Sequence, residues 1–283
     1  MKIAVASGKG GTGKTTVATN MAYCLCKSGA KTTLLDCDTE EPNAHLFFDL
    51  KNIVNQEIGM PIPKLIPEKC NGCSICGDVC RFSAIINIGE LTIIHPGMCH
   101  GCRACWELCP TGALEPSERT LGKVIHGESE GLFISYGKLD IGELSGNRLI
   151  QAVKDNYQLD AINIIDAPPG TSCSVVETLS EIDFLLLVAE PTPFGLANLN
   201  SIVELADKIN IPTGILINRS TAQEDPLIEA YASRKGIKIL GKIPLDRKIA
   251  ELYSSGKLFA KYLTEYHEFF INLNNKIVSQ VEL

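Results

Sequence analysis

Residues 8–16 of the chain read Gly8-Lys9-Gly10-Gly11-Thr12-Gly13-Lys14-Thr15-Thr16. They contain the pattern G-x-x-x-x-G-K-[ST], in which backbone N–H groups of a glycine-rich loop surround phosphate oxygens. The loop follows an apolar run, residues 2–6, and precedes a helix-like stretch, residues 14–28, so it has the strand–loop–helix setting that the motif requires. In this motif the lysine, Lys14, reaches the β- and γ-phosphates, and the Thr15 hydroxyl binds Mg²⁺. The stretch therefore predicts a site for ATP or ADP with Mg²⁺.

The rest of the chain extends this strand–helix pattern. Short apolar runs recur, and helical patterns separate most of them; the runs cover residues 32–35, 162–165, 184–188, 214–217 and 237–240. Alternation of this kind predicts an α/β fold, with a doubly wound, mainly parallel sheet and helices on both of its faces. Residues 121–147 contain six glycines, and we interpret them as strands with tight turns that return the chain to the sheet.

The second lysine of the loop, Lys9, adds information about the family. The form K-G-G-x-G-K-T-T resembles the deviant Walker A motif of the MinD/ParA-type P-loop ATPases, a superfamily that includes the nitrogenase iron protein and the Mrp-type cluster carriers. The resemblance implies ATP hydrolysis in a homodimer, or in a heterodimer with a paralogue, formed through the ATP interface. Lys9 would then reach across to the nucleotide of the partner.

Three later segments resemble functional segments of the same superfamily, and the whole resemblance covers about residues 1–50 and 150–283. Residues 34–43 look like switch I, in which Asp38 would orient the attacking water and Asp36 lies nearer the strand end. Residues 164–171 look like Walker B with switch II, in which Asp166 would hold Mg²⁺ through water. Residues 218–219 resemble the adenine-binding segment, and residues 243–246 resemble the segment that lines the base pocket.

These resemblances give a set of predicted site residues. The predicted catalytic residues are Lys9, Lys14, Asp38 and Asp166. The predicted nucleotide-binding residues are Gly8, Gly10, Gly11, Thr12, Gly13, Lys14, Thr15, Thr16, Asn218, Arg219, Pro244 and Asp246.

Cysteine is unusually frequent in this chain. It accounts for 12 of the 283 residues, and eight of the cysteines lie between residues 70 and 109. A disulfide framework fits poorly, because the chain shows no export signal and is too long to need such cross-links; clustered thiols then favour metal binding. Composition changes abruptly between about residues 61 and 116, a segment that prolines bracket. We therefore predict a P-loop ATPase domain over residues 1–60 and 119–283, interrupted by an inserted domain over residues 61–118.

The inserted segment contains the spacing C-x₂-C-x₂-C-x₃-C twice, at an offset of 29 residues. This duplication resembles a bacterial two-cluster ferredoxin, which implies two [4Fe–4S] clusters, each held by three cysteines of one run and the fourth cysteine of the other. The implied ligand sets are Cys70, Cys73, Cys76 and Cys109 for one cluster, and Cys99, Cys102, Cys105 and Cys80 for the other. Zinc is the alternative, although zinc ribbons use paired C-x₂-C units separated by a longer gap.

The four remaining cysteines have no such spacing. Cys24, Cys26 and Cys37 are expected to fill space in the first helix and at the second strand. Cys173 follows switch II by a few residues, where the nitrogenase iron protein has a cluster-ligating cysteine. Cys173 is therefore either a free thiol or a ligand that two copies share, and no C-x-x-C follows it as in the Mrp-type carriers.

The composition excludes some classes of partner. Lys and Arg number 26 and Asp and Glu number 33, so the net charge of −7 argues against binding to nucleic acid. Residues 257–283 carry three lysines and three glutamates, unlike the basic amphipathic helix of a membrane anchor. No signal peptide precedes the glycine-rich loop, and we expect a cytoplasmic protein without stable membrane anchoring.

The sequence leaves three purposes open. The first is ATP-gated electron transfer through the two clusters to a redox partner protein, because each cluster has a full set of four cysteines. The second is ATP-dependent assembly or delivery of an iron–sulfur cluster or another metallocluster, as the Mrp-type relatives imply. The third is a positioning switch like MinD.

Overall fold

The computed structural model describes residues 1–143 and 145–281. Within these residues, nine strands form one sheet in the order β11-β10-β9-β1-β8-β2-β7-β6-β3. The strands from β11 to β7 are parallel, whereas β6 is antiparallel to both β7 and β3. Their bounds are β1 Lys2–Ala6, β2 Thr32–Asp36, β3 Lys51–Leu65, β6 Leu114–Ser129, β7 Leu132–Leu139, β8 Ile162–Asp166, β9 Phe184–Ala189, β10 Thr213–Ser220 and β11 Lys238–Pro244.

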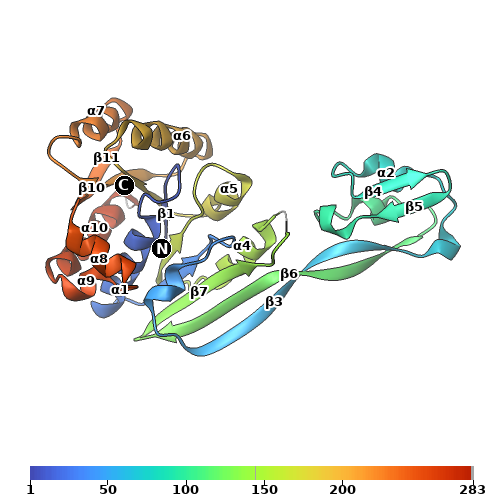
Figure 1. The fold of residues 1–283 in the computed structure, drawn as a ribbon, viewed down its shortest axis with the longest axis horizontal. Helices are drawn as coiled ribbons and strands as arrows, with labels where there is room; N and C mark the ends of the chain where they lie inside the picture. Colours follow the sequence, from blue (N-terminus) through green and yellow to red (C-terminus); the bar gives the residue numbers. More distant parts are fainter. Residues whose placement is uncertain (144, 282–283) are drawn as a thin grey trace.

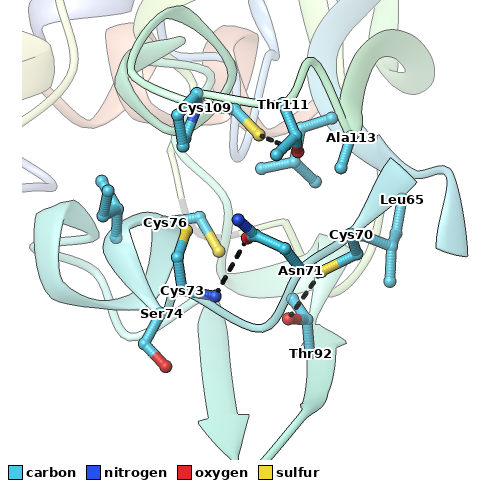
Figure 2. A pocket seen from close by; sticks show the side chains of 13 residues that line it. Leu65, Cys70, Asn71, Cys73, Ser74, Cys76, Thr92, Cys109, Thr111 and Ala113 are labelled. Atoms are coloured by element: carbon cyan, nitrogen blue, oxygen red, sulfur yellow. Dashed lines mark hydrogen bonds between the residues drawn. The ribbon is translucent and has the colours of Figure 1, made fainter. Parts of the chain in front are cut away.

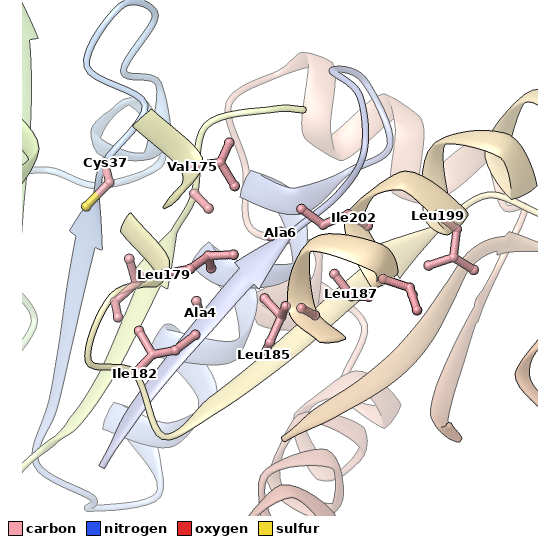
Figure 3. Close-up of a cluster of buried hydrophobic side chains, with 14 of the residues drawn as sticks. Ala4, Ala6, Cys37, Val175, Leu179, Ile182, Leu185, Leu187, Leu199 and Ile202 are labelled. Carbon is pink, nitrogen blue, oxygen red and sulfur yellow. The ribbon is translucent and has the colours of Figure 1, made fainter. Parts of the chain in front are cut away.

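Helices cover both faces of this sheet, which confirms the predicted α/β fold (Figure 1). Alternate residues of β1 show why: Ala4 and Ala6 pack on one side, and Ile3 and Val5 pack on the other. Helices α4 Asn147–Lys154, α5 Cys173–Leu179, α6 Pro193–Ile209 and α7 Pro226–Lys235 supply the first side; Figure 3 shows part of it around Leu185 and Ile202. Helices α1 Lys14–Lys27, α9 Phe259–Tyr262 and α10 Glu265–Val281 supply the second side, and α8 spans Arg247–Ser254.

The strands β3 and β6 form a long two-stranded arm. They pair from Lys51 with Glu128 to Leu65 with Leu114, and Figure 1 shows the arm running from the sheet to a small separate body. This insert, residues 66–113, contains α2 Ile75–Val79, β4 Ile85–Ile88, β5 Leu91–Ile94 and α3 Ala104–Glu107. The domain boundaries predicted at residues 61 and 118 therefore lie inside the arm.

Among the described residues, no helix has the length and apolar character needed to cross a membrane.

Candidate nucleotide site and cysteine pockets

The glycine-rich loop connects β1 to α1. Gly13 is the N-cap residue of α1 and has a φ of 95°, which strains any residue except glycine. A Cβ at Gly8 would collide with the carbonyl group of Asn198 in α6, so close packing also requires glycine there. Thr12 is buried and its hydroxyl has no hydrogen-bond partner. The loop thus brings backbone N–H groups to a helix N-terminus, where an anion is stabilised.

Lys14 and two predicted site aspartates lie together at the carboxyl ends of β2 and β8. Lys14 is 6% exposed, and the carboxylates of Asp166 and Asp38 both act on it. Burial lowers the pKa of Lys14, and these carboxylates oppose that shift. Burial raises the pKa of Asp38 to about 6. The lysine and the carboxylates therefore lie within electrostatic reach of one another in a largely buried site.

Asp166 offers the clearest observation in favour of a cation-binding site. It ends β8, is 1% exposed, and neither carboxylate oxygen has a hydrogen bond of good geometry. Burial, with the nearby charge of Asp36, raises its pKa well above the ordinary value, and the Thr15 hydroxyl beside it acts in the opposite direction. Buried polar groups are normally paired, and carboxylate and hydroxyl oxygens are ligands that Mg²⁺ accepts directly or through water. Thr15 and Asp166 therefore fit a hydrated Mg²⁺ ion.

Two predicted base-binding residues contact the loop itself. The Asn218 side-chain Nδ2 donates a hydrogen bond to the Thr12 carbonyl oxygen at 2.7 Å, and Arg219 Nη2 donates one to the Gly11 carbonyl oxygen at 3.3 Å. Arg219 also forms an ion pair with Glu190. These residues lie beside the glycine-rich loop, where their contact with a base remains a prediction.

The other predicted nucleotide-site residues lie around this centre. Pro244 ends β11, and the Asp246 carboxylate accepts a hydrogen bond from the backbone N–H of Lys248 at 2.7 Å, so Asp246 caps α8. The Lys9 side chain is exposed, as a residue that reaches another subunit must be. Gly10 and Gly11 are also exposed, and Thr16 is half-buried.

The eight clustered cysteines line two pockets of the insert. Figure 2 shows the first, pocket I, which is lined by Cys70, Cys73, Cys76 and Cys109. The second, pocket II, is lined by Cys80, Cys99, Cys102 and Cys105. Each pocket thus combines three cysteines of one run with the last cysteine of the other run. Within the described residues, no group of three or more Cys, His, Asp or Glu side chains is placed to hold a single metal ion.

The cysteines outside the insert occupy different environments. Cys24 and Cys37 are fully buried, as expected for space-filling residues, and burial raises the pKa of Cys24 to about 12. Cys26 is partly buried. Cys173 is exposed at the first position of α5, directly after switch II.

Comparison with known proteins places the chain in a family. Residues 3–259 match the CobQ/CobB/MinD/ParA nucleotide binding domain family. The chain belongs to this family. The resemblance to MinD/ParA-type P-loop proteins, predicted from residues 8–16, is thereby confirmed.

The relatives of this MinD/ParA-type chain include proteins named as iron-sulfur cluster carriers and solved structures of MinD. It is 31% identical over 266 residues to an uncharacterized protein of Methanocaldococcus jannaschii, covering 93% of this chain and 92% of that protein. It is 25% identical to a protein of the same organism named iron-sulfur cluster carrier protein, covering 99% of this chain and 85% of that protein. The fold matches the septum site-determining protein MinD of Pyrococcus horikoshii, solved with Mg-ADP, with a TM-score of 0.59 at 21% identity, covering 98% and 95% of the two chains.

The structure gives Asp36 a role that its sequence position did not reveal. The Asp36 carboxylate accepts hydrogen bonds from the backbone N–H groups of Asp38, Asn43 and Ala44, each at 3.0 Å. Asp36 is fully buried, and burial raises its pKa to about 7 against the effect of these hydrogen bonds. Asp36 therefore shapes the switch I loop in which Asp38 lies.

Switch I also touches the start of α4. The Thr39 carbonyl oxygen accepts a hydrogen bond from the Leu139 N–H at 2.9 Å. The Thr39 side chain fills the space left by two glycines, since a Cβ at Gly137 or at Gly146 would collide with it. These glycines were the only sequence signal for the contact, and they were interpreted as turn residues.

Helix α4 lies between the arm and α5, the helix that follows residues 164–171. The Ser174 hydroxyl donates a hydrogen bond to Asn147 Oδ1 at 3.5 Å, and Lys154 Nζ donates one to the Glu177 carbonyl oxygen at 2.7 Å. On its other side, α4 packs against β3, β6 and β7. Asn147 also shares a cavity with Cys99 of pocket II and with Arg119 of the arm, which is ion-paired with Glu143. Helix α4 therefore lies between Thr39 and α5 on one hand and the cavity that Cys99 of pocket II lines on the other.

Proposed function

We propose that this chain is a dimeric, Mg²⁺-dependent iron–sulfur ATPase that couples ATP binding and hydrolysis to electron transfer through two [4Fe–4S] clusters to a redox partner protein. The observation that carries the proposal is the presence, in one chain, of the buried Lys14–Asp166 site and of two pockets lined by four cysteines each. Helix α4 packs on the arm that carries the insert, and Asn147 of α4 lines a cavity together with Cys99 of pocket II.

Each residue of the nucleotide site has a role in this proposal. The backbone N–H groups of residues 8–16 bind the phosphates, and Lys14 neutralises charge that develops on the transferred group. Thr15 and Asp166 hold the Mg²⁺ ion, directly or through water. Asp38, whose pKa lies near neutrality because of burial, orients the attacking water and accepts its proton.

The cysteine pockets fit iron–sulfur clusters by their donor set and their form. A [4Fe–4S] cluster is held by four thiolates, one at each iron, so its ligands surround a cavity. Pocket I and pocket II both have four cysteine sulfurs around a cavity. A bound cluster supplies reversible uptake of one electron, and the protein supplies its position, its shielding and the hydrogen bonds to its sulfurs.

The dimer in this proposal forms over the nucleotide site. Lys9 is exposed on the loop and free to reach another subunit. Helix α6 lies beside the loop, because its Asn198 packs on Gly8. Phe194 of the same helix is 78% exposed. A second copy that covers the nucleotide would also cover this side chain. The homodimer is thus supported by an exposed cation and an exposed aromatic residue at one face.

The test is an anaerobic measurement of cluster potentials with and without nucleotide. Protein with about eight iron and eight sulfide ions per chain is reduced stepwise with no nucleotide, with ADP and with a non-hydrolysable ATP analogue. A shift of a midpoint potential with nucleotide is expected, because a linked equilibrium makes cluster reduction and nucleotide affinity depend on each other. Lys14→Ala is the matched control and should show no shift. Wild-type potentials that stay the same in all three states would remove coupling at the clusters.

A second candidate is ATP-dependent delivery of a cluster to an acceptor protein. It is favoured by the relatives named iron-sulfur cluster carrier protein and by the exposed Cys173 beside switch II. Transfer of radioactive iron to a cluster-free acceptor ferredoxin distinguishes the two. Transfer that requires ATP and fails in Cys173→Ser, while pockets I and II keep their iron, would favour the carrier.

A further inference from the structure

The two cysteine pockets differ in the side chains that reach their sulfurs. In pocket I, the Thr92 hydroxyl lies 3.8 Å from Cys70 Sγ, the Asn87 amide Nδ2 lies 3.8 Å from Cys76 Sγ, and the Thr111 hydroxyl lies 3.7 Å from Cys109 Sγ. Figure 2 shows Thr92 beside Cys70 and Thr111 beside Cys109. Three of the four sulfurs therefore have a polar side chain within hydrogen-bonding distance.

In the described part of pocket II, the hydrogen bonds to sulfur come from the backbone. The Ala84 N–H donates to Cys80 Sγ at 3.3 Å, and the Gly101 N–H donates to Cys99 Sγ at 3.4 Å. The nearby ring of His100 stacks on Phe82, with centroids 3.9 Å apart. The side chains around pocket II are thus mainly aromatic and apolar, with Pro63, Phe82 and Trp106 in its lining.

The side-chain hydrogen bonds of pocket I leave donors available to two of its sulfurs. Asn87 and Thr92 are paired across the β4–β5 hairpin, and Asn87 Nδ2 donates to the Thr92 hydroxyl oxygen at 2.9 Å. Because that oxygen accepts from Asn87, its own proton is free to point to Cys70. The second hydrogen of the Asn87 amide is free for Cys76. A thiolate has no proton to give, so both groups act as donors once the cysteines ligate iron.

The internal repeat shows that this difference is built into the sequence. At the offset of 29 residues, Asn87 corresponds to Pro116, Thr92 to Leu121 and Thr111 to Phe82. Gly77, where a Cβ would collide with the Asn87 side chain, corresponds to Trp106. Each of these three polar donors in the shell of pocket I is thus replaced by a residue without a hydrogen-bonding side chain. The small residue that admits Asn87 is replaced by a large one.

Hydrogen bonds to cluster sulfurs favour the reduced state. Reduction adds one negative charge, which spreads over the sulfurs, and a donor stabilises the more negative state more strongly. Exposed charges act in the opposite direction, because Arg81 and Arg103 near pocket II favour reduction there and Glu90 near pocket I disfavours it; solvent screens all three. Arg119 is already paired with Glu143. The donors of pocket I lie within 3.8 Å of the sulfurs, and Thr92 is buried and Asn87 partly buried, so we expect them to outweigh the screened charges.

We infer that Asn87, Thr92 and Thr111 make pocket I the site of the higher-potential cluster. The inference rests on the proposed function, because it requires both pockets to hold [4Fe–4S] clusters. One electron from a low-potential donor that enters at pocket II passes to pocket I. The cluster of pocket II returns to its oxidised state, and the cluster of pocket I becomes reduced by one electron. Cys99 of pocket II lines a cavity together with Asn147 and Arg148 of α4, whereas none of the described residues of pocket I lines that cavity. The electron therefore rests at the pocket without this link to α4.

The experiment is an EPR-monitored stepwise reduction of the intact protein without nucleotide. The wild type should show two one-electron steps. Thr92→Val removes the hydroxyl with little change of shape, and it should lower only the higher of the two midpoints. The expected change is at least about threefold in the ratio of reduced to oxidised cluster, which is about 28 mV at 59 mV per tenfold for one electron. Thr111→Val should shift the same step in the same direction.

The matched control is Thr120→Val, an exposed threonine of the arm, which should move neither step. A shift of the lower midpoint, an equal shift of both, or no shift in either pocket I variant would overturn the inference. Iron and sulfide content is measured first for every protein. A wild type without clusters would overturn the proposed function itself, whereas two bound clusters with the opposite order would overturn only the assignment of potentials.

Discussion

The sheet domain and the insert are held together by different means. The domain has two continuous apolar cores, one on each face of the sheet, with fully buried residues such as Leu34, Leu187 and Phe270. In the insert, the buried apolar cluster consists of Ile85, Cys105 and Leu114, with partly buried neighbours that include three more cysteines. So small a core stabilises a structure poorly. We therefore expect the insert, unlike the sheet domain, to depend for its stability on the clusters proposed for its cysteines.

Removal of iron should have the largest effect, and it should affect the insert and leave the sheet domain unchanged. In the absence of clusters, we expect the backbone amides of residues 66–113 to lose protection from hydrogen exchange, while those of β1, β8 and β9 keep it. The reason is that metal binding supplies the folding free energy of small metal-rich units. Trp106 is the single tryptophan of the chain and lies in the insert, so its fluorescence reports on this part alone.

The control for this experiment is the nucleotide site. The cluster-free protein should still bind ADP with unchanged affinity, because the loop and Asp166 belong to the sheet domain. Retained protection throughout residues 66–113 would show that the insert folds without its clusters. The proposed difference between the two regions would then be wrong.

Lys14→Ala should impair the nucleotide site of the sheet domain and leave the insert unchanged. Loss of the buried ammonium group should lower the rate of ATP hydrolysis by about 100-fold or more, since it removes a cation placed at the transferred phosphate. Iron content should remain at the wild-type level. Hydrolysis is measured by phosphate release and iron by a colorimetric assay. Wild-type hydrolysis in Lys14→Ala would place the catalytic centre elsewhere.

Lys154→Met should weaken only the sheet domain. Lys154 is 2% exposed, and its Nζ donates to the Glu177 and Ser180 carbonyl oxygens at 2.7 and 2.9 Å. The variant leaves these carbonyls without a partner, so the free energy of unfolding should fall by about 1–3 kcal/mol. Urea unfolding followed by circular dichroism measures the change. Lys238→Met, at an exposed position, is the control and should change it by less than about 0.5 kcal/mol.

The sequence predicted the sheet domain better than the arm. Most residues of β1, β8 and β9 are buried, so residues 2–6, 162–165 and 184–188 are mainly apolar runs that indicate parallel strands. Residues 51–65 lack such a run and contain Pro61 and Pro63, which argue against a strand. They form one because β3 is an edge strand, where a residue without an N–H is tolerated. Local pattern could not reveal this position at the edge.

The candidate site was likewise predicted only in part from the sequence. The loop, Asp38 and Asp166 were predicted because each follows a recognisable strand. The sequence does not reveal the structural roles of Asp36 and Thr39, because their contacts depend on where the chain places Asn43, Gly137 and Gly146 in space. The cysteine spacing predicted which sulfurs share a pocket only through resemblance to ferredoxins. Of the polar side chains around pocket I, Asn87 and Thr92 come from the β4–β5 hairpin and Thr111 from the loop after Cys109, and none belongs to a motif of its own.

The smallest expected effect concerns Glu130, an ionic link within the sheet domain. Its carboxylate is paired with Lys261 Nζ at 2.8 Å and with Lys27 Nζ at 2.7 Å, and these lysines lower its pKa to about 2. The side chain is 49% exposed, so solvent screens the pairs, and Glu130→Gln should lower the free energy of unfolding by less than about 1 kcal/mol.

The pH dependence of this effect follows from the lowered pKa. An unfolded glutamate has a pKa of about 4.3, so the folded state gains stability from Glu130 above that pH. The gain is lost as the pH falls from about 4.3 toward 2, where the folded carboxylate also takes up a proton. The difference in Tm between wild type and Glu130→Gln, followed by circular dichroism, should therefore be constant from pH 8 to about pH 5 and shrink below it. Because the pairs are exposed, 1 M salt should reduce it as well. A difference that persists at pH 2 would mean that Glu130 stabilises the β6–β7 turn by packing rather than by its charge.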